Sequence, residues 1–205
     1  MKRHFMLVIA FAGLLLAGKV TITSASKFSG TPNTTEMTTP QVGIQELSQA
    51  EMERAQIGLT ISPVQINAGY GRTRFLIGLG SYLVNGVGGC NDCHTNPGHV
   101  EGGDPFRGQP QKINAANFLA GGVKFGPFTS RNLTPDPRKN NLPAGLTLDQ
   151  FIHVIRTGED TQKLHTPISP LLQVMPWPVY AKMADRDLQA IYLYLSAIPH
   201  AEPGQ

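Results

Sequence analysis

The chain contains little cysteine, and this scarcity narrows its chemistry. Only two cysteines, Cys90 and Cys93, occur in 205 residues. A structural zinc site takes four ligands, typically from two Cys or His pairs, and no second cysteine pair is present. The glycine-rich stretches Gly78 to Gly80 and Gly86 to Gly89 do not make the G-x-G-x-x-G pattern of a dinucleotide site. The sequence therefore carries no flavin or quinone fingerprint.

Net charge and long apolar runs are also lacking. Three of the 17 basic residues (Lys2, Arg3 and Lys19) lie in the first 25 positions, which leaves 14 basic against 14 acidic residues in the rest. The part of the chain after residue 25 is formally neutral and gives no support for nucleic-acid binding, so docking must depend on local patches. The apolar run from Phe5 to Ala17 is short for a membrane span.

The first 25 residues are typical of a signal peptide. A basic start precedes that apolar run, and small residues follow at Thr23 to Ala25. We expect cleavage after Ala25 and a periplasmic protein, with a membrane anchor as the alternative if the signal is not cut. Residues 26–41 are rich in Ser, Thr and Pro and predict a flexible tether. Residues 42–71 then form an N-terminal extension, 72–199 the main domain and 200–205 a disordered tail.

What the chain does have is the motif Cys90-Asn91-Asp92-Cys93-His94. Two thiols at this spacing can each bond one vinyl group of a haem, and the adjoining imidazole then binds the iron. The C-x-x-C-H order is typical of c-type haem attachment. One motif predicts one covalent haem c, with Cys90 and Cys93 as thioether sites and His94 as a metal ligand.

Two other uses of a C-x-x-C pair stay open. A dithiol redox pair usually follows a strand in a βαβ setting, whereas the residues before Cys90 have a helical period. A disulfide between residues three apart would not require the neighbouring His94.

Hydrophobic periodicity predicts an all-α fold of three to five helices with long irregular loops. Helices are expected at residues 44–56, 72–85, 147–157 and 185–197. Capping boxes mark two of their starts, Ser48 with Glu51 and Thr147 with Gln150. Glycines within helix 72–85 each cost up to about 1 kcal/mol relative to alanine, which is tolerated where another helix must approach closely.

The middle of the chain, from Thr95 to Pro143, is rich in Gly, Pro, Asn and Thr and has no sustained period. We expect these loops to wall the haem, because a bound porphyrin supplies a core that the loops lack. The aromatic candidates for wall or core positions are Phe106, Phe118, Phe125 and Phe128. Arg131 and Asn132 are candidate partners for the haem propionates, and a backbone carbonyl is expected to accept a hydrogen bond from His94 Nδ1.

The second axial ligand is predicted to be Met175. It lies in a stretch, Leu171 to Pro178, where prolines fix φ and remove backbone donors. Such a stiff strap suits holding a thioether against a metal, and Met with His raises the reduction potential. His165, in a proline-flanked loop, is the rival ligand, and Met183 is expected to be a packing residue.

Several segments together resemble class I c-type cytochromes, and more narrowly the haem domains of the cytochrome subunits of bacterial periplasmic alcohol, aldehyde and gluconate dehydrogenases. They are Gly80 to Tyr82, Gly89 to Thr95, Asn132 to Asp136, Arg156 to Gly158, Met175 to Trp177 and Asp187 to Leu195. The resemblance implies a cytochrome c fold whose first and last helices cross near one haem, with His94 proximal and Met175 distal. Those subunits carry several haem domains and this chain carries one. Ala184 stands where the family has a capping Ser or Thr, and Asp185 is the substitute.

We therefore expect a single-haem electron carrier, not an enzyme. It would pass one electron between redox proteins such as a periplasmic dehydrogenase or a terminal oxidase. The alternative is an electron-accepting cytochrome subunit of a periplasmic dehydrogenase complex. A haem peroxidase or a gas-sensing module would need an open iron position in place of Met175.

Overall fold

The computed structural model describes residues 47–160 and 169–204. The predicted signal peptide (1–25), the predicted tether (26–41) and the rival ligand His165 lie outside these residues. No helix in the two described ranges is long and apolar enough to cross a membrane.

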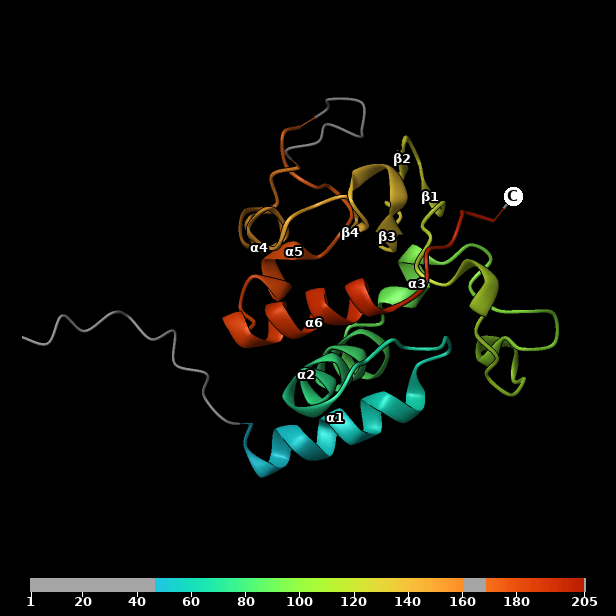
Figure 1. Cartoon of the computed structure of the whole chain (residues 1–205). Helices are drawn as coiled ribbons and strands as arrows, with labels where there is room; N and C mark the ends of the chain where they lie inside the picture. The colour runs from blue at the N-terminus through green and yellow to red at the C-terminus, as the bar shows by residue number, and fades with distance from the viewer. Residues whose placement is uncertain (1–46, 161–168, 205) are drawn as a thin grey trace, which may run out of the picture. The chain divides into compact units, whose positions relative to one another are not determined.

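The predicted all-α fold is confirmed (Figure 1). Within the described ranges, the helices of ten or more residues are α1 (Gln49–Ile61), α2 (Gly71–Tyr82), α4 (Leu148–Thr157) and α6 (Asp185–Ala197). Two short helices, α3 (Cys90–His94) and α5 (Trp177–Tyr180), complete the set. The long middle segment contains more regular structure than expected, because it forms two antiparallel strand pairs. These are β1 (Lys124–Phe125) with β2 (Phe128–Thr129) and β3 (Pro135–Asp136) with β4 (Leu142–Pro143).

Both predicted capping boxes are present. The Ser48 side chain accepts from the Glu51 amide at 3.3 Å, and Glu51 accepts from the Ser48 amide at 2.7 Å. Thr147 and Gln150 make the same reciprocal pair at the start of α4. These caps satisfy amides that have no partner within the helix. Helix α1 ends at Ile61, five residues beyond the prediction. At α6, Ala184 provides no side-chain cap, and Asp185 instead pairs with Arg156 at 2.6 Å.

Helix α2 lies between α1 and α6 and touches both through its glycines (Figure 1). A Cβ added at Gly78 would overlap the Ala55 carbonyl oxygen of α1. A Cβ added at Gly80 would overlap the Ala190 carbonyl oxygen of α6 and lie 2.8 Å from Tyr194 Cβ. The expected close approach of other helices at these glycines is confirmed.

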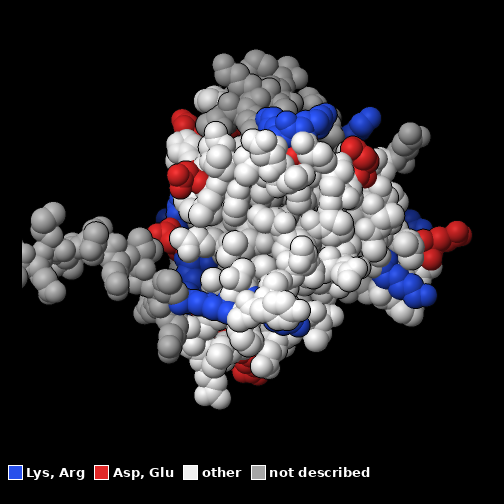
Figure 2. All heavy atoms as spheres, viewed as in Figure 1, with Lys and Arg blue, Asp and Glu red and all other residues white. Residues whose placement is uncertain are grey.

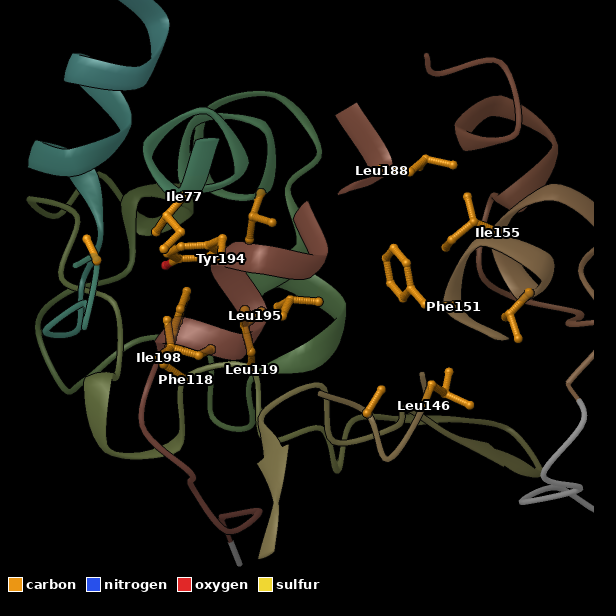
Figure 3. Close-up of a cluster of buried hydrophobic side chains, with 14 residues drawn as sticks. Ile77, Phe118, Leu119, Leu146, Phe151, Ile155, Leu188, Tyr194, Leu195 and Ile198 are labelled. Atoms are coloured by element: carbon orange, nitrogen blue, oxygen red, sulfur yellow. The ribbon is translucent and has the colours of Figure 1, made fainter. Parts of the chain in front are cut away.

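The hydrophobic core joins α6 to the middle loops and to α4 (Figure 3). Tyr194, Leu195 and Phe118 are almost wholly buried, and the Tyr194 hydroxyl lies 2.9 Å from Ser62 Oγ. Phe118 is therefore a core residue, as expected. Phe106 is not: its side chain is 86% exposed because it lies on a 3-10 turn, Pro105–Arg107, outside the core.

Part of the predicted disordered tail is hydrogen-bonded to the middle loops. Asn132 Nδ2 donates to the Ala201 carbonyl at 2.8 Å, and Asn117 Nδ2 donates to the Glu202 carbonyl at 2.9 Å. His200 Nδ1 lies 2.8 Å from the Pro135 carbonyl oxygen. Residues 200–204 thus lie along the loops that follow the C-x-x-C-H motif.

Replacing Gly80 with alanine is expected to lower the free energy of unfolding by at least about 2 kcal/mol, since the new methyl group would force α2 and α6 apart. Gly86→Ala is the matched control, because its nearest neighbour, Ile61 Cδ1, would be at an ordinary 3.5 Å. Urea titration of both variants measures the difference. Equal losses in the two would contradict a specific helix contact at Gly80.

Glu51 joins α1 to α6, and its pKa is lowered by hydrogen bonds from Ser48 and by the charge of Arg186, 3.0 Å away. A lowered pKa in the folded state stabilises the protein above the unfolded pKa, and this contribution disappears as the pH falls through the folded value. Glu51→Gln keeps the cap but loses the ion pair. We expect a loss of about 0.5–1 kcal/mol at pH 7 that shrinks as the pH is lowered and is gone once the pH lies below the folded-state pKa. Urea titrations at pH 7 and at a series of lower pH values check this, with Glu53→Gln, a change on the exposed face of α1, as the control.

Candidate functional site

The C-x-x-C-H motif is carried by a break in the helical backbone. Helix α2 continues as a π-helical turn, Leu83–Val87, which is a rare form often found at functional sites. Gly89 then adopts φ 58°, a left-handed conformation that glycine adopts without strain. The chain turns there into α3, whose single turn contains Cys90, Cys93 and His94. The motif thus follows a helical run, as expected.

Cys90, Cys93, His94 and Met175 all line one cavity of about 810 Å³. The structure therefore brings together the four residues that the sequence singled out, although about 80 residues separate His94 from Met175. The walls are mainly apolar and come from α4, α6, the π-helical turn and the middle loops. They include Val84, Phe125, Phe128, Leu146, Phe151 and Leu195.

The His94 ring is held in one orientation by the backbone. Its Nδ1 lies 2.8 Å from the Arg131 carbonyl oxygen. A carbonyl can only accept, so Nδ1 carries the proton and Nε2 keeps the lone pair that binds a metal. Burial lowers the pKa of His94, as does the nearby Arg131 charge, while the hydrogen bond to Arg131 opposes both. The imidazole is thus neutral, the form in which histidine is a ligand.

The two cysteines are free thiols with raised pKa values. Burial raises the pKa of Cys90 to about 12, and burial together with Asp92 raises that of Cys93. A dithiol redox pair works through a thiolate whose pKa is lowered. The environment of this pair therefore argues against that use and suits sulfurs that stay uncharged as thioethers. No group of three or more His, Cys, Asp or Glu side chains positioned to hold a metal ion is found in residues 47–160 and 169–204.

Arg131 lines the cavity and leaves a donor unused. Its Nη2 pairs with Asp160 Oδ1, and the two side chains are 12% and 8% exposed. Its Nη1 is buried and has no hydrogen-bond partner in the described part of the chain. An unpaired charged donor in a buried site is costly, and a carboxylate of a bound group would satisfy it. Together with the apolar walls, this donor fits a haem, whose propionates are carboxylates.

The other propionate candidate, Asn132, does not line the cavity. Its amide oxygen accepts from the Thr134 hydroxyl at 2.7 Å, while its nitrogen donates to Ala201. This side chain stabilises the loop that carries it.

Met175 lies on a strap that is hydrogen-bonded to the end of α4 and bends at residues 173–175, so the extended conformation predicted from the prolines is not found around Met175. The Leu172 amide donates to the Gly158 carbonyl at 2.8 Å, and Leu171 forms an isolated β-bridge with Glu159. Trp177 then begins α5, and its indole packs so closely on Gly158 that a Cβ there would overlap it. The end of α4 thus contacts the strap on both sides of Met175.

Two residues at this site were missed by sequence reasoning. The Tyr180 hydroxyl donates to the Gly88 carbonyl at 2.9 Å, which joins α5 to the turn before Cys90. Asp160 pairs with Arg131 across the wall. Neither belongs to a recognisable motif, and each becomes evident only when distant segments are brought together.

The remaining candidate iron ligands differ in whether they line the cavity. Among the histidines that the structure describes, His99, His153 and His200 do not line the cavity, and His153 is paired with Glu159 at the surface, 3.0 Å away. Met183 packs against the core, as expected, but it also lines the cavity. The ligand choice of Met175 over Met183 therefore remains a prediction.

The loop at residues 119–121 is joined to the end of α3 by the buried hydroxyl of Thr95. Thr95 is 2% exposed, and its Oγ1 accepts from the Leu119 amide at 2.9 Å. Leu119 is buried at φ 57°, a conformation that L-residues adopt only where the surroundings impose it. The Gly121 amide donates to the His94 carbonyl at 2.6 Å in the same loop.

Comparisons with known proteins found two similar cytochrome subunits. The chain is 31% identical over 119 residues to a gluconate 2-dehydrogenase cytochrome c subunit of Pantoea cypripedii, covering 58% of this chain and 22% of that one. It is 27% identical over 155 residues to the cytochrome c subunit of a quinone alcohol dehydrogenase of Gluconobacter oxydans, covering 74% and 27%. The chain thus matches about a quarter of the length of each relative. No protein-family model and no solved structure matches it.

The fold and the relatives are consistent with each other. The helices, the irregular loops and the cavity beside the C-x-x-C-H turn are consistent with an all-α, cytochrome c-like fold. The curated relatives are cytochrome c subunits of bacterial dehydrogenases. The chain is therefore similar in sequence to cytochrome c subunits, and its helical architecture agrees with that similarity.

Replacing Thr95 with valine is expected to lower the free energy of unfolding by about 1–3 kcal/mol, because the Leu119 amide would be left buried without an acceptor. Thr95→Ser keeps the hydroxyl and removes one methyl group, so its loss should stay near 0.8 kcal/mol. Chemical denaturation of the two variants separates the contributions. A valine variant as stable as the serine variant would show that the hydrogen bond contributes little.

Proposed function

We propose that this protein is a periplasmic single-haem c-type cytochrome that carries one electron at a time between redox proteins. The observation that carries the proposal is the convergence of Cys90, Cys93, His94 and Met175 on one apolar cavity. The likeness to dehydrogenase cytochrome subunits supports it independently of the geometry.

The haem, when bound, supplies an iron centre that gains or loses one electron. The chain's own residues then have distinct tasks. Cys90 and Cys93 would hold the porphyrin through thioether bonds, and His94, oriented by the Arg131 carbonyl 2.8 Å from Nδ1, would bind the iron. Met175 would be the second protein ligand. With the iron held by protein ligands in both states, little would have to move when its charge changes, which suits an electron carrier.

The walls and the surface suit the same role. Apolar side chains such as Phe151 and Leu195 keep water from the cavity, and in such surroundings a change of charge requires little solvent rearrangement. On the face shown in Figure 2, charges of both signs lie mostly towards the edge, around a largely uncharged centre. Docking to another redox protein through such a face would depend on shape and local charges more than on net charge.

The alternative function is an electron-accepting cytochrome subunit of a periplasmic dehydrogenase complex. The two relatives favour it, since each is a cytochrome c subunit of a dehydrogenase. A free carrier would purify alone, and its donor or acceptor could be a dehydrogenase or a terminal oxidase. Purification from the native membrane and soluble fractions distinguishes the two, because a subunit would elute with a larger oxidoreductase.

The proposal predicts a coloured protein when the chain is exported in a host that matures c-type cytochromes. Mass spectrometry should show one added haem per chain, and a pyridine haemochrome assay should report two thioether bonds. Replacing Cys90 and Cys93 together by alanine should abolish the covalent mass increase. A colourless wild-type protein of unmodified mass would refute the proposed function.

Met175→Leu is expected to open the iron, so that the ferrous variant binds carbon monoxide readily while the wild type does not. Met183→Leu is the matched control, because both methionines line the cavity and the substitution is identical. Visible spectra of the reduced proteins with and without carbon monoxide measure this. Carbon monoxide binding by the Met183 variant alone would assign the ligand to Met183, and binding by wild type would contradict a six-coordinate carrier.

A further inference from the structure

The buried ion pair between Arg131 and Asp160 joins two parts of the cavity wall that are 29 positions apart in sequence. Arg131 lies between β2 and β3, and Asp160 lies three residues after Thr157, the last residue of α4. Both side chains line the cavity, at 12% and 8% exposure. A pair so well shielded from water is screened much less by salt than a surface pair.

The Arg131 end of the pair supports the histidine side of the site. Its backbone carbonyl receives the hydrogen bond of His94 Nδ1, at 2.8 Å. The position of the Arg131 main chain therefore decides the orientation of the imidazole. The ion-paired guanidinium and this carbonyl belong to the same residue, so the ion pair helps to hold the carbonyl in place.

The Asp160 end supports the methionine side. Asp160 directly follows Glu159, whose backbone forms the β-bridge with Leu171. One residue earlier, the Gly158 carbonyl accepts from Leu172, at 2.8 Å. Residues 158–160 and 171–172 thus lie side by side, and Met175 follows three residues later. Asp160 is the more deeply buried acid of this bridge: its side chain is 8% exposed, whereas that of Glu159, which also borders the cavity, is 54% exposed and pairs with His153.

We propose that the Arg131–Asp160 pair is a clamp that joins the segment behind His94 to the segment that carries Met175. Asp160 is then a positioning residue: it touches neither the metal nor its ligands, and it acts by keeping the methionine strap closed over the cavity. This inference rests on the proposed function, because it requires His94 and Met175 to bind one iron. Removing one member leaves a buried charge without its partner, so the wall between the two segments loosens.

The test is imidazole binding to the ferric holoprotein, followed by visible absorption, since imidazole competes with a thioether for the iron. Asp160→Asn should bind imidazole at least tenfold more tightly than wild type. Glu159→Gln is the matched control: it removes an adjacent, half-exposed acid that pairs with His153 and not with Arg131, and it should stay within twofold of wild type. An Asp160→Asn affinity within twofold of wild type would overturn the clamp.

A double-mutant cycle shows whether the pair acts as a unit. Arg131→Gln should tighten imidazole binding at least tenfold, and the double variant should match the single variants within about threefold, because all three break the same link. If Arg131→Gln has the effect and Asp160→Asn has none, Arg131 acts alone and the clamp is refuted. If Asp160→Asn does not mature, Asp160→Glu, which has one extra methylene, is measured in its place. An imidazole affinity that differs at least threefold from that of wild type supports the clamp. An imidazole affinity equal to that of wild type refutes it.

The failure of this inference differs from failure of the proposed function. If the wild-type protein carries no haem, both the proposed function and the clamp are refuted. Mass spectrometry can show that the wild-type and variant proteins all carry one covalent haem. If they do and they also bind imidazole alike, only the clamp is refuted.

Discussion

The contact between the backbones of α2 and α6 at Gly80 and Ala190 is the constraint on which the rest of the structure depends. Helix α2 leads without a loop into the π-helical turn and then into α3, so its placement also places Cys90 and His94. Helix α6 contributes Leu188, Ile191 and Leu195 to the cavity. Because the two helices touch without side chains between them, the attachment turn lies beside that wall, and a second glycine contact, at Gly78, adds α1 on the other side.

The cavity has a helical half and a half made of loops. The π-helical turn that follows α2, together with α4 and α6, supplies apolar side chains to the wall. The loops between α3 and α4 supply the carbonyl that orients His94 and the guanidinium that lines the wall. Loops with few apolar residues cannot bury enough surface to order themselves, so their order depends on hydrogen bonds such as Thr95 to Leu119. A bound porphyrin would add the apolar surface that these loops otherwise lack.

The electrostatics of the site favour neutral ligands. Burial raises the pKa values of both thiols and lowers that of His94, so each group stays uncharged near neutral pH. Charged side chains also line the cavity: Arg131 is paired with Asp160, and Asp92 and Glu159 lie on the wall as well. In the proposed carrier, an iron bound here would be surrounded mainly by apolar side chains, so little would have to rearrange when its charge changes by one. Because the Arg131–Asp160 pair is buried, we expect the loss of either partner to disturb the wall.

The sequence alone was sufficient for the local features. Ser48 with Glu51 and Thr147 with Gln150 form the capping boxes, and the C-x-x-C-H turn follows a helix, because each of these features depends on residues within a few positions of one another. The glycines of α2 indicated that other helices approach closely, and the tertiary structure decided that these helices are α1 and α6. Tertiary structure decided what depends on distant segments. It chose the Arg131 carbonyl as the partner of His94, paired Asp160 with Arg131, turned Phe106 outwards and bonded residues 200–204 to the middle loops. These outcomes arise from packing between loops without periodicity, where no repeating pattern records which side chain will meet which.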